Sequence, residues 1–192
     1  MNIITRVRAV NSGLPYLVFC VLLSSGPLAL AEQPAAPRPG PGHARLGYFV
    51  GTWHTKGEFK PGPMGPGGRM TATETCEWFE GRFSIVCHSE GEFPAGPNRS
   101  IGLLGYSAED GKYTYYGADN SGVTMTTVSR GTLQGDTWTY EDESTMGGRL
   151  VRTRVTMKEL SPTSYTFRME ALGADGTWAP LIETSATKVR PE

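Results

Sequence analysis

The chain has 192 residues, of which 38% are hydrophobic and 19% are charged, and its formal net charge at pH 7 is −1. This balance is typical of a globular protein and excludes a chain too polar to fold. It also excludes the strongly basic surface that binds nucleic acid or an anionic membrane.

Residues 1–31 have the pattern of a secretory signal peptide. Arg6 and Arg8 precede an apolar run, and the segment closes with the small-x-small triplet Ala29-Leu30-Ala31. A membrane anchor needs about 20 uninterrupted apolar residues, whereas serines and prolines interrupt this run. We therefore expect cleavage between Ala31 and Glu32, a secreted or periplasmic protein, and no membrane span in the mature chain.

Residues 32–42, EQPAAPRPGPG, contain little that could be buried and are rich in proline. This composition predicts an extended tether with polyproline character. One folded domain is expected to follow over residues 43–192, because the remaining length suits a single core. Its only expected helix is a turn or two over residues 43–50.

From Gly51 onward the apolar residues recur at every second position, which is the period of a half-buried strand. Residues 165, 167, 169 and 171 are apolar or aromatic, while polar side chains occupy the positions between them. Turn-forming segments such as Glu109-Asp110-Gly111 and Ala174-Asp175-Gly176 separate the alternating stretches. The pattern predicts about ten short strands.

Short connections require consecutive strands to be antiparallel neighbours. A meander of this many strands avoids unpaired edges most simply by closing into an up-and-down barrel. The last strand then lies beside the first, which brings Lys188 or Arg190 close to Trp53. We expect Trp53 to close one end of the barrel with a cation over its ring.

The motif Gly51-Thr52-Trp53, with a basic residue at the end of the last strand, resembles the signature of lipocalins and the wider calycin group. The stretches TETCEWFEGRF and GYSAEDGKYTYYGADNSG resemble a bacterial family of secreted calycin-like domains of unknown function, over roughly residues 43–190. This resemblance implies a lipocalin-like barrel and no particular activity.

Two cysteines, Cys76 and Cys87, remain after the expected loss of Cys20 with the signal peptide. If Gly81 and Arg82 form a two-residue hairpin loop, then Cys76 faces Cys87 and Glu80 faces Phe83. Directly opposed residues lie about 5 Å apart at Cα, close enough for a disulfide. The same register turns both cysteines and Trp78 toward the interior.

Neither a metal site nor a cofactor is expected, because the sequence has no CxxC pair and no Cys/His cluster. Nitrobindin-like proteins use a ten-stranded barrel of similar outline to hold haem through a histidine. In this chain alternation turns His54 and His88 outward and His43 precedes the barrel. We expect all three histidines to be exposed.

Other polar residues are expected to have no catalytic role. Glu141, Asp142 and Glu143 are interpreted as a solvated loop beside a turn. Asn98 begins a glycosylation acceptor triplet, whose use depends on a source that the sequence does not reveal.

The remaining candidates are aromatic residues expected on inward-facing positions of several strands, and a barrel of eight or more strands can hold one small ligand. They are Trp78, Tyr115, Trp138, Tyr140, Tyr165 and Phe167. The same side chains would suit a packed core, and the pattern leaves both readings open.

The favoured hypothesis is a barrel that binds a small apolar or amphipathic molecule without covalent chemistry. Two alternatives remain. One is a solid barrel that acts through its outer surface in the cell envelope, and the other is an enzyme with an interior acid–base pair, for example Glu90 with an arginine of the ninth strand.

Overall fold

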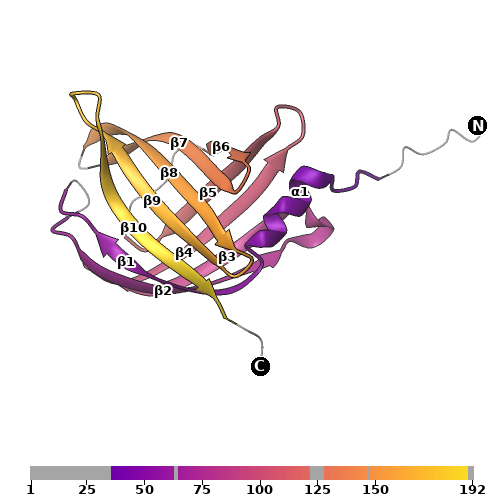
Figure 1. Ribbon diagram of the computed structural model, residues 1–192, viewed down its shortest axis with the longest axis horizontal. Helices are drawn as coiled ribbons and strands as arrows, with labels where there is room; N and C mark the ends of the chain where they lie inside the picture. Colours follow the sequence, from indigo (N-terminus) through magenta and orange to yellow (C-terminus); the bar gives the residue numbers. More distant parts are fainter. Residues whose placement is uncertain (1–35, 63–64, 122–127, 147, 190–192) are drawn as a thin grey trace, which may run out of the picture. The chain divides into compact units, whose positions relative to one another are not determined.

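The computed structural model describes residues 36–62, 65–121, 128–146 and 148–189, which form a closed antiparallel barrel (Figure 1). A short helix α1 (Pro41–Arg45) and a 3-10 turn η1 (Leu46–Tyr48) precede the barrel. The ten strands are β1 (Gly51–Phe59), β2 (Gly68–Trp78), β3 (Ser84–Phe93), β4 (Gly96–Ser107), β5 (Lys112–Asp119), β6 (Ser129–Gln134), β7 (Thr137–Met146), β8 (Arg149–Ser161), β9 (Ser164–Leu172) and β10 (Trp178–Lys188). The expected fold class is confirmed.

Every strand pairs with the next one along the chain, and β10 returns to pair with β1. The closing ladder runs from Trp53 opposite Lys188 to Phe59 opposite Ile182. Figure 1 shows these two strands side by side although they come from opposite ends of the domain. Because β1 and β10 pair with each other, neither of these two strands is left as an open sheet edge.

The structure differs from one expectation about the N-terminal region. Helix α1 begins at Pro41, so the last two residues of the expected tether belong to the helix. Proline suits this position because its missing N–H would have had no partner in the first turn. Residues 1–31, with the expected signal peptide, lie outside the described residues. In the part of the chain that is described, no helix is both long and apolar enough to cross a bilayer.

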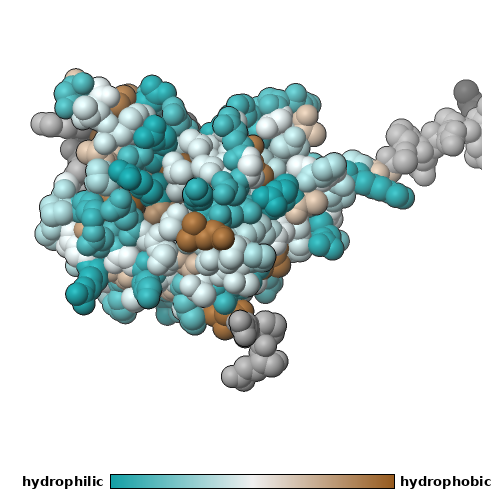
Figure 2. Space-filling view, in the orientation of Figure 1, coloured by the Kyte–Doolittle hydropathy of each residue, from teal (hydrophilic) through white to brown (hydrophobic). Residues whose placement is uncertain are grey.

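The packed core lies at the end of the barrel that carries α1. Leu46 and Phe49 enter the barrel from η1 and its C-cap, and both are buried. They meet Trp53, Trp138 and Tyr165 in one hydrophobic cluster. The outer face seen in Figure 2 is mostly hydrophilic, with isolated hydrophobic residues.

The hairpin of β2 and β3 has the expected register, with Cys76 opposite Cys87 and Trp78 opposite Ile85. Its loop is longer than expected, since the strands end at Trp78 and Ser84, and Glu80 and Phe83 lie in the loop between them. Gly81 and Arg82 both have positive φ, at 81° and 60°. Glycine takes this conformation readily.

Two polar expectations were wrong. His43 is buried, because its ring packs edge-on against Phe83 and Tyr106 and its Nδ1 accepts a hydrogen bond from the Gly40 N–H. His54 and His88 are exposed as expected. The three carboxylates at positions 141–143 lie within β7 rather than in a loop.

Candidate functional site

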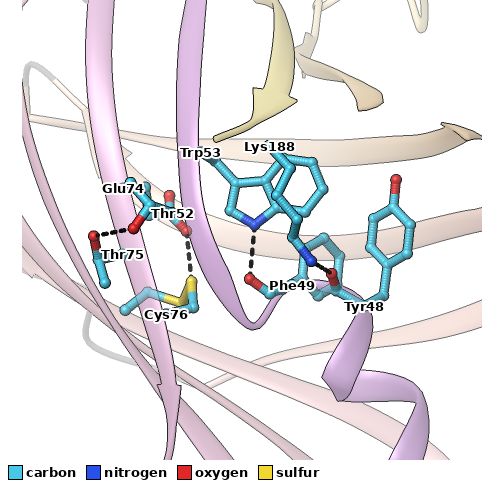
Figure 3. The surroundings of a disulfide bond; sticks show 9 residues. Tyr48, Phe49, Thr52, Trp53, Glu74, Thr75, Cys76 and Lys188 are labelled. Carbon is cyan, nitrogen blue, oxygen red and sulfur yellow. Dashed lines mark hydrogen bonds between the residues drawn. A yellow bond between two sulfur atoms is a disulfide. The ribbon is translucent and has the colours of Figure 1, made fainter. Parts of the chain in front are cut away.

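Trp53 plugs the α1 end of the barrel and is only 1% exposed. Its indole Nε1 donates a hydrogen bond to the Phe49 carbonyl at 2.7 Å, and Lys188 Nζ lies 4.8 Å from the ring centroid (Figure 3). Lys188 also donates to the Tyr48 carbonyl at 3.1 Å. The last strand therefore fixes the plug through its terminal lysine, while Arg190 lies outside the described residues.

A disulfide joins Cys76 and Cys87 just inside the plug, as the hairpin register predicts. Both cysteines are buried and belong to the core cluster. The bridge links β2 to β3 in the wall, so neither sulfur is available as a thiolate. The disulfide belongs to the packed core cluster at this end of the barrel.

Glu74 is a partly buried acid that the sequence reasoning overlooked. It lies two residues before Cys76 on β2 and so faces the interior, where one of its carboxyl oxygens lies 3.1 Å from Cys76 Sγ (Figure 3). A disulfide sulfur has no proton to donate but accepts weakly, so this contact suits a protonated carboxyl. Burial raises the pKa of Glu74, which favours that protonated form.

Three tyrosines point into the same interior. Tyr115 on β5 and Tyr165 on β9 both lie close enough to Glu74 for its charge to raise the pKa of their phenols, although burial is the larger cause. Burial raises the pKa of the Tyr140 phenol on β7, and the charge of Tyr115 raises it further. The hydroxyl of Tyr140 is buried and has no hydrogen-bond partner, which leaves a donor available inside the barrel.

Tyr115 is more exposed than the other inward-facing tyrosines of the barrel. It lies on the inward face of β5, two residues after the buried Tyr113, and it is nevertheless 36% exposed. At the same time burial raises the pKa of its phenol to about 12. The two observations agree if the ring borders a solvent-accessible space inside the barrel wall.

Glycine makes room for this ring. A Cβ on Gly117 would lie 2.5 Å from the Tyr115 hydroxyl oxygen, and a Cβ on Gly102 would lie 3.1 Å from its ring. A side chain at either position would displace the phenol. These two glycines on β4 and β5 therefore set where the Tyr115 ring lies.

The structure separates the aromatic residues that the sequence grouped together. Trp138 is 0% exposed and packs between Phe49 and Tyr113, so it has no surface free for a ligand. Trp78 lies at the α1 end beneath Arg82 and borders a pocket of about 580 Å³ that also involves Arg38. Phe167 is partly buried against the core.

Only one cluster of potential metal ligands occurs in the described part of the chain, formed by Glu74, Cys76 and Cys87. Because its cysteines are joined in the disulfide, the cluster offers one carboxylate and no thiolate. That donor set is unlike the sites of zinc or other thiophilic metals.

The proposed acid–base pair of Glu90 is not found. Its side chain lies outside the barrel, 70% exposed, and pairs at 3.5 Å with Arg99 of β4 rather than with the ninth strand. Arg168 of β9 instead pairs with Glu170 and Glu183.

Two further polar residues are less accessible than the sequence suggested. Asp142 accepts a hydrogen bond from Ser129 at 2.8 Å. Asn98 is buried and donates to Asn120, so its amide is a poor acceptor for a glycan.

A groove of about 730 Å³ crosses the outer face of β10, β1, β2, β3 and β4. Its outward-facing lining is polar, with hydroxyl groups and charges of both signs. The lining includes His54, Lys56, Thr71, Thr73, Glu90 and Arg99. Among the described residues, none of the groove's lining side chains has a buried polar atom without a hydrogen-bond partner, so the interior is the stronger candidate site.

The family model described as protein of unknown function DUF1579 matches residues 38–188, from just before α1 to the end of β10. The chain belongs to this family. No curated protein is similar enough to match it. Membership in DUF1579 agrees with the expectation of a family of unknown function and supplies no activity.

Two solved structures share the fold of this DUF1579 chain. Rv2717c from M. tuberculosis is 14% identical, with a TM-score of 0.58 over 79% of this chain and 99% of its own. The S-type phycobiliprotein lyase CPES from Guillardia theta is 13% identical, with a TM-score of 0.50 over 78% of this chain and 92% of its own. At these identities the likeness shows the lipocalin-like barrel alone.

The partly buried acid gives the DUF1579 domain a pH-dependent stability. Because the pKa of Glu74 is higher in the folded protein, the folded state binds its proton more tightly than the unfolded chain does. That contribution is complete below the unfolded pKa of about 4.3 and is lost as the pH rises through the folded value.

We therefore expect the stability of Glu74→Gln to rise relative to the wild type as the pH is raised from 4 to 8, because the wild type loses this contribution and glutamine does not titrate. Urea unfolding at several pH values measures the difference. Glu77→Gln, at an exposed position on the same strand, is the control and should show no such trend. A Glu74→Gln difference that stays constant with pH would contradict the expectation.

Proposed function

We propose that the barrel interior binds a small amphipathic molecule reversibly, without covalent chemistry. The observation that carries this proposal is Tyr115, an inward-facing aromatic ring that is more than a third exposed. Beside it lie a buried carboxyl group, Glu74, and the unpartnered hydroxyl of Tyr140. A few polar groups converging in a largely apolar cavity are typical of small-molecule sites.

The ligand-facing residues in this proposal are Tyr115, Tyr140 and Phe167, with Glu74 added to the expected set. Trp78 and Trp138 support the closed end of the barrel instead. A ligand would gain affinity from desolvation against the aromatic rings, and the hydroxyl groups would fix its orientation.

The proposal includes export of the protein to a secreted or periplasmic location. The disulfide supports it, because such bonds persist in oxidising compartments and are rare in the reducing cytosol. The signal-like pattern of residues 1–31 points the same way.

The rival function, a surface interaction, has one observation in its favour. Ile101, Leu103 and Tyr116 are exposed on neighbouring positions of β4 and β5. They are three residues rather than an extended apolar face, and single exposed apolar side chains are common on soluble proteins.

Titration of tryptophan fluorescence with a panel of fatty alcohols, isoprenoids and aromatic compounds tests the proposal. We expect saturable quenching, and we expect Tyr115→Ala to weaken the affinity about tenfold, because a buried ring contributes roughly 1.5 to 3 kcal/mol. Tyr116→Ala is the matched control, since it removes the adjacent outward-facing ring and should leave binding unchanged. Loss of affinity in the Tyr116 variant, with the Tyr115 variant unaffected, would place binding on the outer surface.

A further inference from the structure

The interior acid has no cationic partner in the described part of the chain. None of the nine ion pairs there includes Glu74, and burial alone accounts for its raised pKa. In the ladders, Glu74 stands between Trp53 on β1 and Ser89 on β3. Its nearest polar contact is the weakly accepting disulfide sulfur, at 3.1 Å. Such an acid is costly to bury until a cation or a strong hydrogen-bond partner reaches it.

The groups that face Glu74 from across the barrel are phenols. Tyr115 comes from β5 and Tyr165 from β9, and the charge of Glu74 acts on both. Phenol rings present a negative face that attracts cations. The inward-facing cation, Lys188, is already placed over Trp53 and bonded to the Tyr48 carbonyl. The interior around Glu74 therefore offers a carboxyl group and aromatic faces, with no basic side chain directed at it.

We propose that the ligand of this barrel is an organic cation, an ammonium group on an apolar body, seated against Glu74 and the ring of Tyr115. This inference rests on the proposed function and names its ligand class. The ammonium group pairs with the carboxylate, and the apolar body occupies the space beside Tyr115. A fatty acid is disfavoured at this position once Glu74 is ionised, because its carboxylate would then face a like charge.

Binding of the cation displaces a proton. In the free protein burial raises the pKa of Glu74, so the carboxyl group holds its proton more tightly than an exposed glutamic acid does. The arriving ammonium group stabilises the carboxylate, so the proton leaves to solvent as the ion pair forms. The ammonium group keeps its own proton, and no covalent bond is made or broken.

The test uses n-nonylamine, n-nonanol and nonanoic acid, which share one alkyl chain and differ in the head group, with 2-phenylethylamine and 2-phenylethanol as a second matched pair. We expect each amine to bind the wild-type protein about tenfold more tightly than its alcohol. Glu74→Gln should abolish that preference and leave the affinity for the alcohols unchanged. Glu77→Gln, on the outer face of the same strand, should keep it.

Calorimetry in two buffers of different ionisation enthalpy supplies a second measurement that needs only the wild-type protein. At pH 5 amine binding should release up to one proton, while alcohol binding releases none. Equal binding of amine and alcohol, or amine binding without proton release, overturns the cation assignment while leaving the proposed function intact. Tighter binding of the alcohol or of nonanoic acid also overturns it. If none of the five compounds saturates, both the assignment and the proposed function fail.

Discussion

Replacing Trp53 with alanine should lower the free energy of unfolding by about 3 to 5 kcal/mol, as expected for the loss of a large buried ring. The side chain is 1% exposed and contacts Tyr165 at a ring-centroid distance of 4.9 Å. The substitution also leaves the Phe49 carbonyl without its indole donor. Urea unfolding followed by circular dichroism measures the effect without depending on tryptophan fluorescence.

Two controls distinguish the effect of losing the buried Trp53 side chain from the effect of losing any tryptophan. Trp178→Ala removes the same side chain from the outer face, where Trp178 lies under Arg154 at 4.4 Å, and should cost about 1 kcal/mol. Lys188→Ala removes the cation over the plug and should cost a similar amount. A Trp53→Ala protein that unfolds like the wild type would show that the barrel end does not depend on this ring.

Removing the disulfide should be the second largest change. The bond closes a short loop, with a sequence separation of 11, and a loop of this size corresponds to about 2 to 3 kcal/mol. We expect the double variant Cys76→Ala, Cys87→Ala to lose at least that much, because alanine also leaves space around two buried positions.

Treatment with a reductant separates the contribution of the disulfide to stability from the contribution of side-chain packing around it. Dithiothreitol should destabilise the wild-type protein and leave the double variant unchanged. Peptide mapping of exported, oxidised protein without reductant should recover the Cys76 and Cys87 peptides joined. Two free thiols in that material would refute the bridge.

Local patterns were enough to predict the hairpin that carries these cysteines. The register of β2 against β3 depends only on where the turn lies and on the period of two, and both are visible between residues 76 and 87. The same alternation also predicts which way Glu74 faces, because a residue two positions before the inward-facing Cys76 must face inward as well. That signal was in the sequence, and an acid on an inward-facing position should have been read as a candidate site.

Other features depend on which side chains fill the barrel interior. The alternating pattern of a strand does not predict this. Trp138 and Tyr115 both alternate inward, yet Phe49 packs on the first and the second borders open space. The difference arises because η1 inserts its side chains at one end of the barrel only. His43 was misjudged for the same reason, since its burial depends on Phe83 and Tyr106 from distant loops and strands.

Closure of the wall by β1 and β10 has a consequence for the order of folding. The other nine ladders each join consecutive strands, whereas the contact of Trp53 with Lys188 spans almost the whole domain. Contacts of such large sequence separation are slow to form because the intervening chain must first be ordered. An N-terminal fragment that lacks β10 would keep β1 and β9 as open edges and would lack the lysine over its plug. Within the barrel, pairing of β10 is therefore the step that removes these open edges, which are sites of aggregation.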